Sequence, residues 1–241
     1  MFNKCLTGLL IWITASTIVS AQTRLIENST RQIIVEFSLP APQLSEIELD
    51  GQTYTRFDYD GARMIRQPGA PMLPYSITNL AIPPGATAKM SYEILGQEEY
   101  SGKIALPGIP SVGVKTPETV RLDEDIYNGA APFPATIVEM TEPADVRFMR
   151  TVTLQIQPVQ YLPAEQSLRV IKKIRIRIDI SGGQIATRTA KISEVEQDYH
   201  RRRLLNYETS KNWGLPQKYA LQRTTVDYSL NSGTWLKIPV T

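Results

Sequence analysis

The chain has 241 residues, of which 42% are hydrophobic and 21% are charged, and its formal net charge is +2. This composition is typical of a globular chain and excludes an intrinsically disordered one, and the length suits one large β domain or two small ones. The nearly balanced charge excludes a global attraction to nucleic acid or to an acidic membrane, so we expect no nucleic-acid partner.

The N-terminal segment predicts a secretory signal peptide, residues 1–21. Lys4 gives a positive start, residues 6–19 form an apolar run, and small residues end at Ala21, after which we expect cleavage. An uncleaved membrane anchor is the alternative, but the run is shorter than the ~20 apolar residues that span a bilayer. The only cysteine, Cys5, lies in this segment. We therefore expect a mature chain with no disulfide, no cysteine nucleophile and no stable membrane span.

The next segments favour β-strands. Residues 31–39 form a β-rich run that prolines close. Asp50 and Gly51 stand between two alternating runs, which favours a two-residue hairpin turn because both residues tolerate a positive φ. Residues 87–95 form another strand-like run, and residues 132–145 form one that prolines interrupt.

The clearest strand pair lies further along the chain. Residues 152–157 and 173–180 each alternate apolar and polar side chains, and residues 163–167 predict the turn between them. Each strand therefore has one apolar face. Many short strands, frequent Gly and Pro, and no alternation of strands with helices favour a mainly β fold. We expect an antiparallel, jelly-roll-like β-sandwich over residues 22–182.

Residues 183–228 predict one short C-terminal helix and a connector. Ser193 with Glu196 fits a capping box within residues 191–206. The apolar residues at helical spacing are Ile192, Val195 and Tyr199. Residues 229–241 contain an apolar run without a closing signal, so we expect them to be the truncated start of a following domain.

Catalytic and metal-binding patterns are missing from the sequence. A hydroxyl or thiol nucleophile needs an imidazole base, and we interpret the single histidine, His200, as a surface residue on the polar side of the predicted helix. Metal sites need several ligands at short spacing. Asp58 and Asp60 beside Gly61 favour a turn over a calcium loop. We therefore expect no catalytic residue, no metal and no cofactor in this chain.

Two basic stretches each allow two interpretations. One strand face carries a row of cations that either binds an anionic partner or keeps the face solvated and discourages edge pairing. That row consists of Lys173, Arg175 and Arg177. Three consecutive arginines offer either a site for a processing protease or a basic helix end that the helix dipole favours. They are Arg201, Arg202 and Arg203.

A proline-rich stretch, which we call the proline strut (residues 68–75), combines strand-like neighbours with residues that cannot donate to a β ladder. Its prolines fix φ and bias the preceding residues to extended geometry, which predicts a rigid edge or crossing segment. It either crosses the sandwich edge as a structural element or offers a preformed surface to a partner domain. The candidate partner-facing residues are Pro71, Leu73, Pro74 and Tyr75.

Three segments carry a family resemblance. "GAPMLPYSITNLAIPPGA" resembles the G-x-P-x-L-P…I-P-P-G segment of propeptides from the gingipain family of secreted cysteine peptidases. "RFMRTVTLQIQPVQYLPAEQSLRVIKKIRIRIDI" is similar to that family's R-x-V-x-L-x-I-x-P-V-x-Y-x-P stretch and the strand after it, and "SGTWLKIPVT" resembles the start of the next domain. The three occur in the family's order.

The resemblance implies a β-sandwich prodomain that keeps a caspase-like Cys/His peptidase latent and assists its folding. The partner would be the downstream peptidase domain of the same precursor, which would be a cysteine endopeptidase. It also implies export from a Gram-negative bacterium of the Bacteroidetes kind through the type IX pathway, whose sortase is a relative. The family's catalytic Cys and His have no counterpart here.

The resemblance further implies an inhibitory basic residue in a loop of the sandwich. Residues 100–118 are loop-like and offer Lys103 and Lys115. The alternative function is an autonomous secreted β-sandwich that binds a protein or a glycan with the proline strut as its recognition surface.

Overall fold

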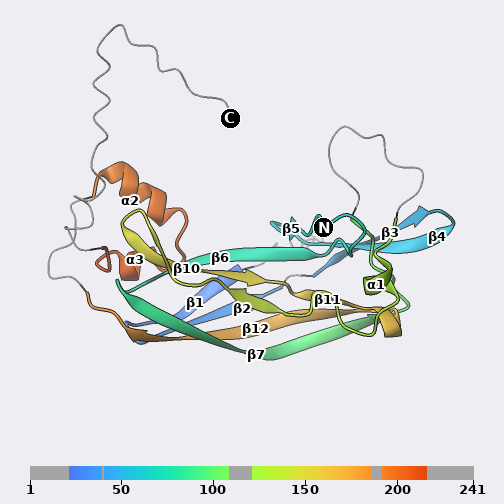
Figure 1. The fold of residues 1–241 in the computed structure, drawn as a ribbon, viewed down its shortest axis with the longest axis horizontal. Helices are drawn as coiled ribbons and strands as arrows, with labels where there is room; N and C mark the ends of the chain where they lie inside the picture. The colour runs from blue at the N-terminus through green and yellow to red at the C-terminus, as the bar shows by residue number, and fades with distance from the viewer. Residues whose placement is uncertain (1–21, 40, 109–120, 186–191, 216–241) are drawn as a thin grey trace, which may run out of the picture.

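Two antiparallel sheets form most of the molecule in the computed structural model, which describes residues 22–39, 41–108, 121–185 and 192–215 (Figure 1). The first sheet contains β1 (Gln22–Asn28), β2 (Gln32–Ser38), β7 (Ala86–Ser101), β11 (Val159–Leu162) and β12 (Ser167–Gly182). The second contains β5 (Arg63–Met64), β6 (Pro74–Ile82), β8 (Val138–Met140), β9 (Ala144–Val146) and β10 (Met149–Ile156). The prediction of a mainly antiparallel β fold is confirmed.

The core lies between the two sheets because each contributes one apolar face. In β12 alternate isoleucines such as Ile174 and Ile176 are fully buried, and in β10 so are Val152 and Leu154. The alternation that the sequence shows over residues 152–157 and 173–180 therefore marks the inward faces. A hydrogen bond of 2.8 Å from Arg150 Nε to the carbonyl oxygen of Ala86, together with this shared core, links β10 to β7 across the layers.

Within the first sheet, β12 pairs with β7 over the whole length of both strands. On its other side β12 pairs with β2 and then with β11. The 3-10 helix η1 (Pro163–Glu165) makes the predicted turn into β12, and Gln166 there has a φ of 44°. In the second sheet β6 lies between β5 and β10, and β8 and β9 pair with β10.

A two-stranded hairpin of β3 (Gln43–Leu49) and β4 (Gln52–Asp58) extends from one end of the sandwich (Figure 1). Asp50 and Gly51 form its turn with φ values of 52° and 74°. Only glycine and short polar residues take such values readily, so the predicted hairpin turn is confirmed.

Helices occupy opposite ends of the molecule. The short α1 (Glu124–Tyr127) lies at the end that carries the hairpin, and α2 (Glu194–Arg201) and α3 (Tyr207–Ser210) lie at the other end, over β6 and β10 (Figure 1). The Ser193 side chain accepts a hydrogen bond from the backbone N–H of Glu196, as the capping box predicts. The helical region is broken at Arg202, so it forms two short helices rather than the single one expected.

Two expectations about α2 are wrong. His200 is 1% exposed rather than on the surface, and Val195 is 79% exposed although its spacing indicated a buried face. The helix packs through its C-terminal end, where a turn brings Leu204 onto β6, and that contact rotates His200 inward. Tertiary contact thus overrides the weak apolar pattern of this short helix.

Candidate partner-binding surface

The proline strut leads from β5 to β6 and binds residues 105–108 in an extended, ladder-like arrangement. The backbone N–H of Met72 donates to the carbonyl oxygen of Leu106 at 2.7 Å, and that of Gly108 donates to Ala70 at 2.7 Å. The N–H of Gly69 donates back to Gly108 at 3.1 Å. The strut therefore holds the residues that lead directly into the segment 109–120.

The residues that follow the same segment are held at the same place. The backbone N–H of Asp123 donates to the carbonyl oxygen of Gly69 at 3.0 Å. Gly69 has a φ of +81°, and a Cβ there would lie 3.0 Å from the backbone oxygen of Arg121. A Cβ on Gly108 would lie 2.3 Å from the carbonyl oxygen of Gln67. Both positions thus require glycine, and the strut holds Gly108 and Asp123, which lie on either side of residues 109–120.

Most of the strut itself is buried. Pro71, Leu73 and Pro74 are buried, and Tyr75 alone of the four candidate partner-facing residues keeps a half-exposed side chain. This placement favours the structural interpretation of the prolines, with Tyr75 left as the residue available to a partner. The missing N–H of Pro74 leaves no gap in a ladder, because Pro74 lies outside the register with β10.

Of the two candidate inhibitory lysines, Lys103 lies among the described residues and Lys115 does not. Lys103 Nζ lies 2.6 Å from Glu46 Oε1, and this hydrogen bond and charge hold the pKa of the Glu46 carboxyl below its ordinary value. Lys103 is therefore occupied by a residue of the β3–β4 hairpin. Lys115 lies outside the described residues, as does Ala21 at the predicted signal cleavage site.

The three consecutive arginines lie at the C-terminal end of α2, each beside a side chain of the same region. Arg201 pairs with Glu208 at 3.2 Å, Arg202 pairs with Asp198 at 2.9 Å, and Arg203 lies over the Tyr199 ring at 4.5 Å. All three are exposed, but they sit in a hydrogen-bonded turn. A processing protease would need this turn to open, because proteases cut extended segments.

Arg147, in the turn between β9 and β10, joins the arginine turn to the sandwich. It lies 2.6 Å from Glu196 and 4.0 Å above the Tyr199 ring, so two arginines flank that ring. Beneath them, burial lowers the pKa of His200, and the nearby Glu196 carboxylate partly offsets this. His200 Nε2 and Glu196 Oε2 are buried without a hydrogen-bond partner among the described residues.

Each cation in the row on β12 has a carboxylate beside it, and two of them share one carboxylate. Lys173 and Arg175 pair with Glu36 at 2.7 and 3.2 Å, and the hydrogen bond from Lys173 is the largest cause that lowers the pKa of Glu36. Arg177 approaches Asp179 at 3.8 Å. The pairing favours a solvated sheet face over a binding site for an anionic partner.

No group of three or more metal-ligating side chains occurs in the part of the chain that the structure describes. Among those same residues no helix is long and apolar enough to cross a membrane.

An open groove of about 680 Å³ lies beside the strut, where β5 meets β6. It is lined by Ala62, Arg63, Met64, Ile65, Arg66, Tyr75 and Gln155. The sequence gives no signal for Arg63 and Arg66, because the two-residue β5 is too short to show any period, whereas Gln155 lies on the polar face of a predicted strand. The need for glycine at positions 69 and 108 was also missed, although "QPGAP" and "LPG" are turn-like patterns that could have indicated it.

Comparison with known proteins gives relatives for most of the chain. A family model described as Propeptide_C25 matches residues 18–213. Lys-gingipain of Porphyromonas gingivalis strain ATCC 33277 is 27% identical over 180 residues, which cover 70% of this chain, and Lys-gingipain W83 of the same species matches equally. The match spans only 10% of the length of these relatives.

Two solved structures share the fold. One is described as the "Complex of Porphyromonas gingivalis RgpB pro- and mature domains" and matches with a TM-score of 0.65 and 21% identity, over 78% of this chain and 97% of that one. The other concerns "zymogenic latency of gingipain K from Porphyromonas gingivalis", with a TM-score of 0.56 and 24% identity, over 67% and 93%. Because the family model covers well over half of the sequence, the chain belongs to the Propeptide_C25 family, the gingipain-family propeptides.

Proposed function

We propose that this chain is the N-terminal prodomain of a secreted gingipain-like cysteine peptidase, in which it inhibits the peptidase domain and assists its folding. Membership of the propeptide family supports this role, as does the likeness to a prodomain bound to its mature domain. The precursor is a cysteine endopeptidase whose catalytic residues lie outside this chain. The partner is the peptidase domain of the same precursor.

One observation carries the proposal. The strut holds the residues on either side of 109–120, because Gly108 is hydrogen-bonded to Gly69 and Ala70, and Asp123 is hydrogen-bonded to Gly69. Only glycine fits at positions 69 and 108. Because the residues on either side are fixed, closing an inhibitory loop between them costs less entropy than in a chain with free ends. Lys115 in this segment is the inhibitory residue, and Lys103 is not, because Glu46 already binds it.

The test uses the signal-free chain, from Gln22, and the cognate peptidase domain. The Lys115→Ala variant is expected to weaken inhibition of peptide hydrolysis by about 30-fold or more, since truncating a central anchor costs about 2 kcal/mol or more. Lys103→Ala is the matched control and should leave the inhibition constant within about threefold. Full inhibition by the Lys115→Ala variant would refute the assignment of Lys115, and no inhibition by the unmodified chain would refute the prodomain role.

The organisation of the precursor follows from the same proposal. Signal peptidase cuts after Ala21, the sandwich over residues 22–182 forms the inhibitor, and residues 183–228 connect it to a domain that begins within 229–241. The protein is exported through the periplasm of a Gram-negative bacterium by the type IX pathway. Cleavage after Arg201, Arg202 or Arg203 separates the prodomain, and mass spectrometry of the secreted fragments locates that cut.

A further inference from the structure

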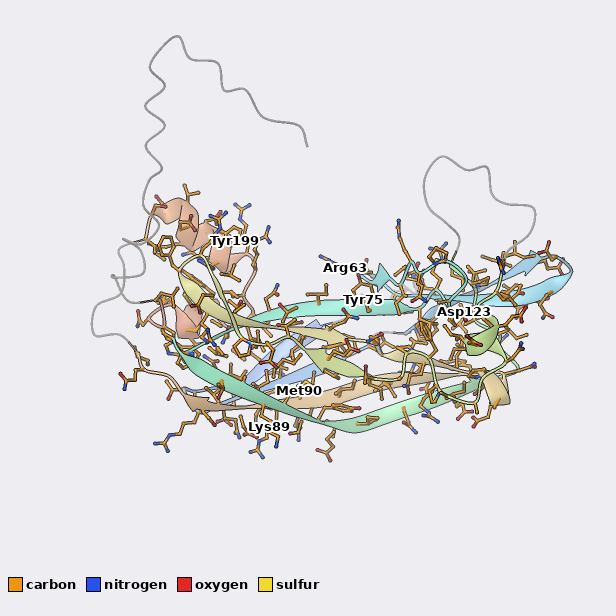
Figure 2. All side chains as sticks on the ribbon, viewed as in Figure 1. Arg63, Tyr75, Lys89, Met90, Asp123 and Tyr199 are labelled. Carbon is orange, nitrogen blue, oxygen red and sulfur yellow. The ribbon has the colours of Figure 1, made fainter. Side chains whose placement is uncertain are left out.

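The groove beside the strut lies on the outer face of the second sheet. Arg63 of β5 is paired with Tyr75 of β6, so both side chains project from the same face, as Figure 2 shows. Gln155 of β10 is paired with Ile77 and continues that face. The groove is therefore built on three neighbouring strands and on the residues that directly flank β5.

The groove carries two cations without partners. Arg63 and Arg66 are exposed, and neither has an ion pair or a side-chain hydrogen bond with any residue that the structure describes. No aspartate or glutamate lines the groove. This differs from the rest of the second sheet, where Arg150 pairs with Asp145 at 2.9 Å. The groove consequently attracts anionic groups, and guanidinium groups bind carboxylates in a bidentate geometry.

The groove also has an open backbone edge. The N–H of Ile65 donates to the carbonyl oxygen of Leu73, so in an antiparallel ladder the N–H and C=O of Met64 point away from β6. No described residue makes a hydrogen bond to either group of Met64. An unpaired strand edge accepts an extended polypeptide, which is how many proteins bind peptides.

Apolar surface lies between the two charges and along the sheet. Met64, Ile65 and Tyr75 are half-buried in the wall of the groove, and Ile77 next to it is 37% exposed. Side chains of an extended segment alternate, so a segment on the Met64 edge turns every second residue toward the outer face, on which Arg63 and Tyr75 lie.

We propose that an extended acidic segment of the downstream peptidase domain binds in this groove as an added strand. Its backbone pairs with Met64, its carboxylates bind Arg63 and Arg66, and an apolar side chain packs on Tyr75. A free polyanion such as nucleic acid would use the arginines but not the strand edge, so the edge favours a polypeptide. This inference rests on the proposed function, because it assigns to the chain a second contact with the peptidase in addition to the inhibitory residue.

The experiment measures the dissociation constant between the signal-free chain and the peptidase domain, at low and at physiological salt. The Arg63→Glu/Arg66→Glu variant is expected to raise the dissociation constant by about 10- to 100-fold at low salt and to weaken its salt dependence. Arg63→Lys/Arg66→Lys keeps the charge but not the bidentate geometry, so an intermediate loss is expected. Two exposed cations of the first sheet and its turn supply the control: Lys89 lies on β7 (Figure 2), and Arg31 lies in the turn between β1 and β2. The Arg31→Glu/Lys89→Glu variant should stay within about threefold of the unmodified chain.

The possible outcomes separate this inference from the proposed function. If the unmodified chain binds the peptidase domain and the Arg63→Glu/Arg66→Glu variant binds no more weakly than the control, the groove is not the contact, while the prodomain role stands. If the unmodified chain does not bind the peptidase domain, both fail. If the charge reversal changes only the self-association seen by size-exclusion chromatography, the occupant is a second copy, and the inference is overturned.

Discussion

The edge of β6 that faces away from β10 is covered at two places, and the two covers are built differently. At residues 79–81 the cover is the turn between α2 and α3. The side chain of Asn206 accepts from the N–H of Ala81 at 2.8 Å and donates to its carbonyl oxygen at 2.9 Å, so one amide takes the place of a neighbouring strand. At Tyr75 the cover is the two-residue β5, whose far edge is open.

The side chains differ in the same way. The helical end is sealed by a second apolar cluster, which consists of Ala81, Met149, Leu204, Tyr207 and Trp213. At the other end, Arg63 and Arg66 are exposed and have no partner among the described residues, and Tyr75 is half-buried. The second sheet is therefore covered by its own chain at the helical end and exposed at the β5 end. The covered end stabilises the fold, and the exposed end is accessible to a partner.

The strongest way to break this comparison is to remove the centre of the closed end. Trp213 is 5% exposed within the second apolar cluster, so Trp213→Ala should lower the free energy of unfolding by about 3–5 kcal/mol, as large-to-small changes do. Urea denaturation of the signal-free chain measures this. Val195→Ala is the control, because Val195 is 79% exposed, and should change stability by less than about 0.5 kcal/mol. Equal effects would mean that the helices are not part of the cooperative fold.

A second variant removes the amide that replaces a strand. Asn206→Leu leaves both backbone groups of Ala81 without partners in a buried place and should cost about 2–4 kcal/mol. Denaturation together with hydrogen exchange at Ala81 measures the effect, and faster exchange there is expected. The exposed Asn128 supplies the control as Asn128→Ala. A loss below about 0.5 kcal/mol would show that solvent replaces Asn206 without penalty.

The parts of the fold that the sequence predicted are those in which a local pattern and the tertiary environment agree. The isoleucines at positions 174–180 of β12 all lie on the inward face, because every second side chain of a strand projects from the same face of the sheet. Asp50 and Gly51 make their turn because few other residues adopt both φ values, and Ser193 caps α2 through a contact only three residues away. Each of these depends on neighbours in sequence.

The parts that sequence reasoning missed depend on distant contacts. His200 is buried because the turn after α2 bonds to Asn79, about 120 residues earlier, and no local period encodes that contact. The groove forms because Arg63 of β5 pairs with Tyr75 of β6, at the two ends of the connection between these strands. The two residues of β5 are too few to predict a strand. Asp123, which follows residues 109–120, is likewise held by a hydrogen bond to Gly69, a residue far from it in the sequence.

The closed end should also make stability depend on pH. Burial lowers the pKa of His200 below the value of about 6.5 that histidine has in an unfolded chain. The unfolded state therefore binds more protons, so stability is full above about pH 6.5 and is lost as the pH falls toward the folded pKa, by at most about 1.4 kcal/mol per pH unit. Because His200 is the only histidine, His200→Phe should flatten unfolding curves between about pH 7 and 5.5. A slope that persists in the variant would contradict this assignment.

The smallest effect is expected at the open end, where Arg63 and Arg66 have no partners among the described residues. Arg63→Gln/Arg66→Gln should change the free energy of unfolding by less than about 0.5 kcal/mol, since exposed side chains without such partners contribute little to stability. Arg147→Gln is the matched change at the closed end and should cost about 1 kcal/mol, because it removes the ion pair with Glu196 and the contact with the Tyr199 ring. Thermal denaturation of both variants beside the unmodified chain measures the difference. A loss at the open end as large as that of Arg147→Gln would mean that these arginines serve the fold, and their exposure would then be no argument for a partner.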